Sequence, residues 1–239
     1  NPIVRHTVLR RRQTLENAGL LERVGVDIHP DPDTSAAAYA GVGFSGLGLL
    51  TNLPFDLAYQ AAEAFTAALK KRTKAAGFMK TLLLQRICSS FASGRSTAER
   101  MLRREVLDDE EQAKLIEEAL SALTPDEAGY LRTIAAELSR PEARDPKLAA
   151  VRYFLTEHRT EGKTWLEHGC IVFSQYYDTV YSLGAELAML LPGEPVGVYA
   201  GAGKSGMFRG DDFASVERDD IKSAVKKREI RLVVATDAA

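Results

Sequence analysis

Hydrophobic residues recur at three- and four-residue spacing through the middle of the chain, which is typical of amphipathic helices. Met79, Leu83 and Ile87 show this spacing and fall on one face of a helix. The pattern predicts helices over Phe55–Lys74, Phe78–Arg104, Asp109–Leu123 and Pro125–Arg140. The last of these has a clear start, because Thr124 can cap the helix and Pro125 fits its first turn. Residues before 142 are therefore expected to be mostly helical.

The first fifty residues are more irregular. Arg10–Arg12 form a short basic cluster, and Arg23–His29 is the one segment there that predicts a strand. Ala36–Leu50 is rich in glycine and alanine, so we expect an ordered loop rather than regular structure.

After Asp145 the pattern alternates between helical and strand-like segments. Helical period is found in Lys147–His158, Thr179–Leu191 and Asp219–Arg228. Short apolar runs typical of buried parallel strands are found in Cys170–Phe173, Val196–Tyr199 and Ile230–Ala235. This alternation predicts βαβ units, a parallel sheet and helices on its faces. We therefore expect a mostly helical region over residues 1–141 and an α/β domain over residues 142–239.

Composition narrows the class of protein. The 239 residues suggest one or two domains, and 45% hydrophobic with 27% charged residues is typical of a globular chain. No apolar stretch approaches the roughly 20 residues of a membrane helix. The two cysteines, Cys88 and Cys170, match neither a disulfide framework nor a zinc spacing, which indicates the cytoplasm. A formal net charge of -2 excludes a bulk polycation, so any contact with nucleic acid has to be local.

The candidate chemistry lies just after the three expected strands, because ligands gather outside the carboxyl ends of parallel strands. The residues there are Ser174, Gln175, Gly201, Thr236 and Asp237. Hydroxyl and amide groups can bond to phosphate oxygens, and glycine lets a nucleic-acid strand approach the main chain. The alternative interpretation is that these residues are polar turns and helix caps.

Gly203-Lys204-Ser205 resembles the end of a Walker A phosphate loop. That loop needs another glycine five positions before Gly203, where this chain has Val198. A phosphate loop also opens directly into a helix, and no helical period follows Ser205. The sequence predicts a flexible surface loop here.

Four segments in order resemble the second RecA-like lobe of superfamily 2 helicases, and in particular the bacterial branch of the SWI/SNF-like ATPases. They are Asp145-Pro146-Lys147, Cys170–Tyr176, Val198–Gly201 and Leu232–Ala239. In that family Phe173-Ser174-Gln175 corresponds to motif IV, and Ala235-Thr236-Asp237 opens motif V. Upstream, Arg86-Ile87-Cys88-Ser89-Ser90 is similar to an Arg-x-x-Ser-Ser element of the bacterial branch.

The resemblance implies a RecA-like three-layer fold and specific roles. Thr236 would contact the nucleic-acid backbone, Asp237 would hold the motif V turn, Ser174 and Gln175 would lie at the nucleic-acid face, and Gly201 would sit nearby. ATP and Mg²⁺ would be bound mainly by a first lobe that this chain lacks, so the chain alone is expected to be inactive. It would be a fragment of an ATP-dependent translocase acting on nucleic acid, with duplex DNA as the favoured substrate. On this resemblance, residues 1–141 would be the helical connector and insert after the first lobe, and residues 142–239 would be the second lobe up to motif V.

Two other functions remain open. The helical insert, Phe55–Arg140, could contact nucleic acid or a partner protein, and the whole chain could be a non-catalytic binding module. The other alternative is an independent nucleotide-binding enzyme that uses Gly203-Lys204-Ser205.

Overall fold

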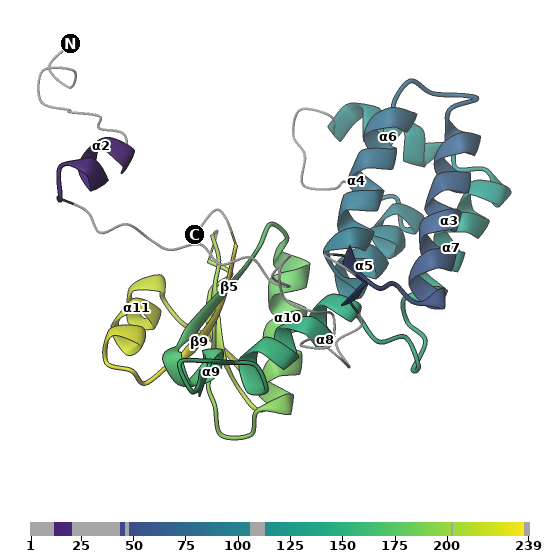
Figure 1. Ribbon diagram of the computed structural model, residues 1–239. Coiled ribbons are helices and arrows are strands. Elements are labelled where there is room, and N and C mark those ends of the chain that lie inside the picture. The colour runs from purple at the N-terminus through teal and green to yellow at the C-terminus, as the bar shows by residue number, and fades with distance from the viewer. Residues whose placement is uncertain (1–11, 21–43, 46–47, 106–112, 202, 237–239) are drawn as a thin grey trace, which may run out of the picture. The chain divides into compact units, whose positions relative to one another are not determined.

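The computed structural model describes residues 12–20, 44–45, 48–105, 113–201 and 203–236 (Figure 1). The chain divides into two compact units, residues 1–48 and 49–239. The first unit contributes α2 (Arg12–Asn17) and β1 (Phe44–Ser45), and β2 (Gly48–Leu49) lies at the boundary. The features expected at Arg10, Arg11 and Arg23–His29, like Asp237, lie outside the described residues.

The second unit begins with a bundle of helices. They are α3 (Leu53–Leu69), α4 (Ala76–Ser89), α5 (Phe91–Leu102), α6 (Ala113–Ser121) and α7 (Pro125–Glu137). The expected start of α7 is confirmed, because Thr124 and Glu127 form a reciprocal capping box. The single helix expected over Phe78–Arg104 is wrong. Ser90 has extended backbone angles (φ -163°, ψ 160°) that end α4, and its hydroxyl accepts the amide of Ser93 to start α5.

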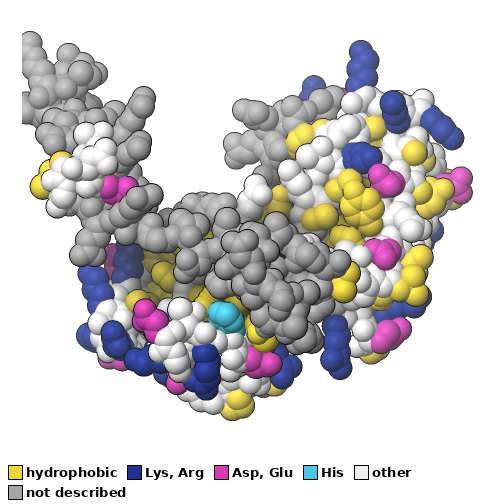
Figure 2. Space-filling model, in the orientation of Figure 1, with side chains coloured by type: hydrophobic (Ala, Val, Ile, Leu, Met, Phe, Trp, Pro, Cys, Tyr) yellow, Lys and Arg dark blue, Asp and Glu magenta, His cyan; other side chains and the backbone are white. Residues whose placement is uncertain are grey.

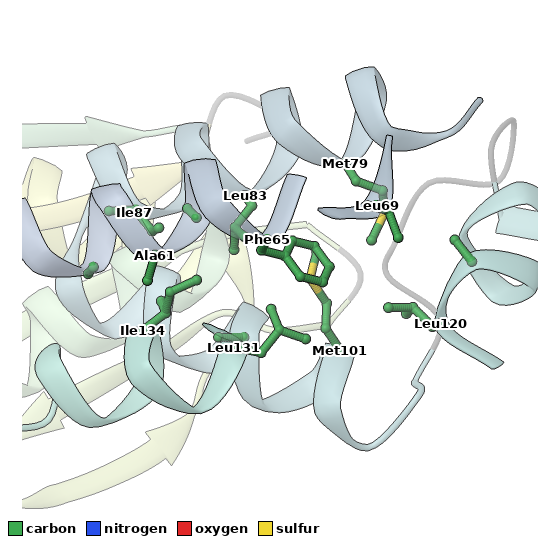
Figure 3. Packing of buried hydrophobic residues seen from close by; sticks show 14 of the residues in the cluster. Ala61, Phe65, Leu69, Met79, Leu83, Ile87, Met101, Leu120, Leu131 and Ile134 are labelled. Carbon is green, nitrogen blue, oxygen red and sulfur yellow. The ribbon is translucent and has the colours of Figure 1, made fainter. Parts of the chain in front are cut away.

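The bundle has a closed apolar core. Phe65 from α3, Leu83 from α4, Met101 from α5 and Leu131 from α7 are all fully buried, and Figure 3 shows their side chains pointing toward one another. Gly94 allows α5 to approach α4, because a Cβ at this position would lie 2.9 Å from the Cα of Ile87. Met79, Leu83 and Ile87, whose spacing predicted one face of a helix, are all buried in this core.

The rest of the unit is an α/β lobe. Its helices are α8 (Pro146–Thr156), α9 (Trp165–His168), α10 (Tyr177–Leu190) and α11 (Arg218–Lys226). Its strands are β3 (Arg159–Thr160), β4 (Lys163–Thr164), β5 (Cys170–Ser174), β6 (Val196–Tyr199), β7 (Gly206–Arg209), β8 (Asp212–Ser215) and β9 (Leu232–Thr236). β3 and β4 form a separate antiparallel pair. The alternation expected after Asp145 is confirmed.

The main sheet has five strands in the order β5-β9-β6-β7-β8. β5, β9 and β6 are parallel, as expected, but β7 and β8 are antiparallel, so the sheet is mixed. The loop predicted at Gly203-Lys204-Ser205 is present, but it leads directly into the β7–β8 hairpin, which the sequence pattern did not indicate. Its start depends on Gly206, where any Cβ would clash with the ring of Phe213 and the carbonyl oxygen of Ala214.

Helices cover the two faces of this sheet unequally. In Figure 1, α10 lies on one side of the strands and α11 on the other. On the α10 face, side chains from β5, β6 and β9 pack with residues of α8 and α10 into one apolar cluster. On the opposite face a smaller cluster forms around Ile221 of α11. Ile171 and Phe173 of β5 point to that second face and are 53% and 64% exposed.

Candidate nucleic-acid interface

The parallel strands bring the predicted residues to one edge of the sheet. Ser174 is in register with Thr236 on the neighbouring strand, and Ala235 is in register with Tyr199, so Gly201 follows β6 at the same edge. Strands in a sheet lie about 4.8 Å apart, which places Ser174 and Thr236 side by side. We call Ser174, Gln175, Gly201 and Thr236 the strand-end edge. Sequence reasoning correctly expected these four to come together.

Accessibility differs strongly along the strand-end edge. Gln175 is exposed, while Ser174 and Gly201 are half-buried. Thr236 is only 7% exposed, so its side chain offers little surface to a ligand. Gln175 is therefore the most accessible polar side chain of this edge.

A cluster of hydroxyl groups from α4, the N-cap of α5 and α10 lies next to Ser174. The Oγ1 of Thr179, in the first turn of α10, is 2.8 Å from the Oγ of Ser89 and 2.8 Å from the Oγ of Ser90. The Oγ of Ser89 is in turn 3.4 Å from the Oγ of Ser174, which is a long contact. The sequence contained both serines in the Arg-x-x-Ser-Ser element but did not show that they meet the sheet.

Arg86, from the same element, packs on the turn that follows Ser174. Its guanidinium carbon lies 3.9 Å from the ring centroid of Tyr176, and one of its terminal nitrogens lies 3.9 Å from a carboxylate oxygen of Asp178. The hydroxyl of Tyr176 donates to Gln85 at 3.1 Å. The end of α4 thus contacts the strand-end edge through both charged and aromatic groups.

Two cations flank the end of β6. The guanidinium carbon of Arg218 lies 4.7 Å from the ring centroid of Tyr199, and the ammonium of Lys222 lies 5.7 Å from it. Hydrogen bonding from Lys222, and then from Arg218, lowers the pKa of Tyr199 below its usual value despite some opposing desolvation. Sequence reasoning missed this pair, although the spacing of four places both cations on one helix face.

The wider surface is not uniformly basic. On the face shown in Figure 2, Lys and Arg side chains are interspersed with Asp and Glu. Any attraction for phosphate therefore has to come from local groups such as Arg218 and Lys222 rather than from the field of the whole chain.

The Gly-Lys-Ser segment does not form a phosphate cradle. Ser205 is buried, its hydroxyl donates to the carbonyl oxygen of Ala200 at 2.7 Å, and it accepts the amide of Ala200 at 3.0 Å. Lys204 points toward the ring of Tyr177, with its ammonium 5.1 Å from the centroid. The chain then enters β7 instead of a helix. These residues close a loop and do not fit a nucleotide phosphate.

Within the described ranges, no cluster of three or more His, Cys, Asp or Glu side chains is arranged to hold a metal ion. Among the helices of those ranges, none combines the length and apolar character needed to cross a membrane.

Comparison of the chain with protein-family models, with curated proteins and with solved structures found no match.

Proposed function

We propose that this chain carries a nucleic-acid-contacting lobe of an ATP-driven translocase, with duplex DNA as the substrate. The four sequence segments that resemble the second lobe of SWI/SNF-like ATPases support the assignment, and so does the α/β sheet with its parallel β5-β9-β6 core. On this proposal, Gln175, Ser174 and the main chain at Gly201 contact phosphate oxygens of the backbone.

The observation that carries the proposal is the register between Ser174 and Thr236. It assembles hydroxyl and amide groups from two strands that are 62 residues apart in sequence at one edge of a parallel sheet, where phosphate ligands are commonly bound. Arg218 and Lys222 lie at the end of the adjacent β6, and the positive charge of Lys222 is partly neutralised by Asp219, whose carboxylate oxygen lies 3.1 Å from its ammonium. Hydroxyl, amide and cationic groups are all of the kinds that contact phosphate oxygens.

ATP and Mg²⁺ would be held mainly by a first lobe and not by the residues of this α/β lobe. Phosphoryl transfer requires a phosphate cradle, a metal site and charge stabilisation together, and Ser205 is already engaged by the backbone of Ala200. We therefore expect the chain alone to bind nucleic acid without hydrolysing ATP.

The test is a titration of the chain with a short fluorescent duplex at about 50 and about 200 mM salt. Because cations that contact phosphates release counterions, contacts to roughly two phosphates should weaken the affinity about tenfold between these concentrations. Binding that is absent at both concentrations would contradict the proposal.

A matched pair of variants locates the contact. Gln175→Glu puts a negative charge on the strand-end edge, so the affinity should fall several-fold. Thr160→Glu introduces the same charge at an exposed position near the amino end of β5, where the carbonyl oxygen of Thr160 bonds to His168, and should leave the affinity unchanged. Equal losses in both variants would place the contact elsewhere.

A second function, a module that binds another polypeptide, is favoured by one observation. Ile171 and Phe173 form an exposed apolar pair on the sheet face that α11 leaves uncovered. The same titration separates the two functions, because a polypeptide-binding module has no reason to bind a duplex in a salt-dependent way.

A further inference from the structure

The α4–α5 elbow, residues 85–90, joins the end of α4 to the start of α5 and contacts the α/β lobe. We propose that this elbow is a positioning device that fixes the turn after Ser174, so that the helical bundle controls the geometry of the strand-end edge. The role in nucleic-acid binding rests on the proposed function, whereas the positioning itself does not.

Arg86 is the first part of the device. Its side chain is only 13% exposed, and it spans both Tyr176 and Asp178, the residues on either side of the start of α10. Tyr176 is the N-cap residue of α10 but makes no side-chain capping bond. Its position is therefore set by contacts from outside the helix, namely the guanidinium of Arg86 on its ring and Gln85 at its hydroxyl.

The hydroxyl cluster is the second part. Each hydroxyl has one proton to donate, and a chain from Ser90 to Thr179 to Ser89 to Ser174 uses each of the first three protons once. In this arrangement the hydroxyl of Ser174 accepts a hydrogen bond from Ser89 and can donate its own proton to a ligand at the strand-end edge. The long final contact of 3.4 Å leaves Ser174 free to adjust when a phosphate oxygen is bound.

Asp145 anchors the elbow to the lobe from the other side. One of its carboxylate oxygens accepts the amide of Phe91, at the start of α5, at 2.8 Å. The other accepts the amide of Lys147 at 2.9 Å and so caps α8. A single carboxylate thus ties the first turns of two helices together, one from the bundle and one from the lobe. This link holds the start of α5 against the lobe, directly after the elbow that contacts Tyr176 and Ser174.

The first test is hydrogen exchange of the full chain with Arg86→Ala. The amide of Val180 donates to the carbonyl oxygen of Tyr176, so releasing Tyr176 should speed exchange over residues 174–183. We expect about a tenfold increase, which is the scale of one partly desolvated cation–π contact. Exchange over the bundle core, residues 58–69, should stay unchanged, which separates local release from general destabilisation.

The matched control is Arg95→Ala. Arg95 lies on α5 and forms an exposed pair with Glu99, and its charge acts on α10 at Glu186, outside the measured segment, so its loss should leave exchange over residues 174–183 as in the wild type. Equal exchange in the Arg86 and Arg95 variants, or a uniform increase throughout the unit, would overturn the proposal.

Duplex binding gives the second readout. Ser89→Ala should weaken binding several-fold, while Ser121→Ala, which removes a hydroxyl bonded within α6, should have no effect. Arg86→Lys should behave like Arg86→Ala, with weakened duplex binding and fast exchange over residues 174–183. The reason is that an ammonium cannot replace a stacked planar guanidinium. If lysine restores affinity while exchange stays fast, Arg86 acts as a direct phosphate contact and the positioning role is wrong.

These readouts keep the two proposals apart. If the wild-type chain binds no duplex, only the proposed function is wrong. The positioning role of the elbow is still tested, because it is measured by the exchange rates of residues 174–183 in the Arg86→Ala variant. Normal exchange in Arg86→Ala would defeat the elbow alone, even if the wild type bound DNA tightly.

Discussion

The helical bundle and the α/β lobe bury their apolar residues in different ways. In the bundle, large side chains from α3, α4, α5, α6 and α7 close around one another, and Phe65, Leu69, Met79 and Leu83 are fully buried. In the lobe, the sheet is well covered on the α10 face but only partly on the α11 face. Ile171 and Phe173 are left exposed on strand β5, which lies at the edge of the sheet.

This difference is consistent with the role that we propose for each region. A bundle with a closed core can act as a rigid body that holds something else in place, as we propose for the α4–α5 elbow. The lobe has polar residues such as Ser174 and Gln175 at its strand ends and leaves Ile171 and Phe173 exposed, and exposed apolar surface is typical of regions that contact other molecules.

The largest expected contrast comes from the same substitution in the two regions. Phe65→Ala removes a ring that is 0% exposed and should cost about 3–5 kcal/mol of unfolding free energy. Phe173→Ala removes a ring that is 64% exposed and should cost less than about 0.5 kcal/mol. Urea denaturation measures both. Similar losses would mean that Phe173 is covered in solution, and the contrast between the regions would disappear.

A glycine pair should change stability in opposite directions. Gly206→Ala places a Cβ 2.6 Å from the carbonyl oxygen of Ala214 and against the ring of Phe213, so the β7–β8 hairpin has to shift. We expect a loss of about 2–3 kcal/mol. Gly129→Ala in α7 meets no atom within 4 Å and should stabilise the bundle by up to about 1 kcal/mol. Thermal unfolding checks both, and a harmless Gly206→Ala would show that the hairpin is loosely packed.

The pair of Arg72 and Glu127 should make the bundle sensitive to acid. Burial by itself raises the pKa of Glu127, but hydrogen bonds from Arg72 and from the amide of Thr124 outweigh it, and the net shift is downward. The carboxylate therefore stabilises the fold above about pH 4.5, and this contribution is lost as the pH falls through the folded pKa.

Glu127→Gln should accordingly cost about 2 kcal/mol at neutral pH, because the 2.7 Å bond to Arg72 loses its charge. The wild type should lose stability more steeply than the variant as the medium is acidified, which chemical denaturation at several pH values measures. Parallel pH profiles would contradict this role for the pair.

Glu186 should show the smallest effect, with the opposite sign. Burial, and then the charge of Asp145, raises the pKa of Glu186, although Ser182 and Arg95 act against this shift. The charged form is therefore disfavoured in the fold, and this penalty disappears as the pH falls below the folded pKa. The carboxyl group is partly enclosed by its neighbours but the residue as a whole is exposed, so solvent screens the penalty and Glu186→Gln should stabilise the lobe by less than about 0.5 kcal/mol at neutral pH. A measurable loss of stability on thermal unfolding would contradict this sign.

Much of the fold could be predicted from hydrophobic spacing alone. The parallel strands were evident because Cys170–Phe173, Val196–Tyr199 and Ile230–Ala235 are short apolar runs between helical segments. The β7–β8 hairpin was missed because its signal is a contact across strands, between Gly206 and Phe213, that no local pattern contains. The break at Ser90 was missed because hydrophobic period continues through it, and only the backbone angles and the cap on Ser93 end the helix.

The candidate site divides in the same way. Ser174 and Thr236 could be placed together because residues at the ends of neighbouring parallel strands share an edge. The contacts that the bundle makes with the site could not be predicted. Ser89 is 90 residues from Thr179 in sequence, and no sequence pattern around either residue indicates that their hydroxyl groups meet. Contacts of this kind depend on how two packed regions meet.

The central claim is that the carboxyl ends of β5 and β6 bind nucleic acid, and a hydrogen-exchange footprint of the wild-type chain with and without saturating duplex tests it most directly. The account predicts slower exchange on duplex binding over residues 171–178 and 199–206, at the strand-end edge. Slower exchange confined to residues 166–170, 193–196 and 229–232, at the opposite ends of β5, β6 and the strand β9 between them, would contradict it.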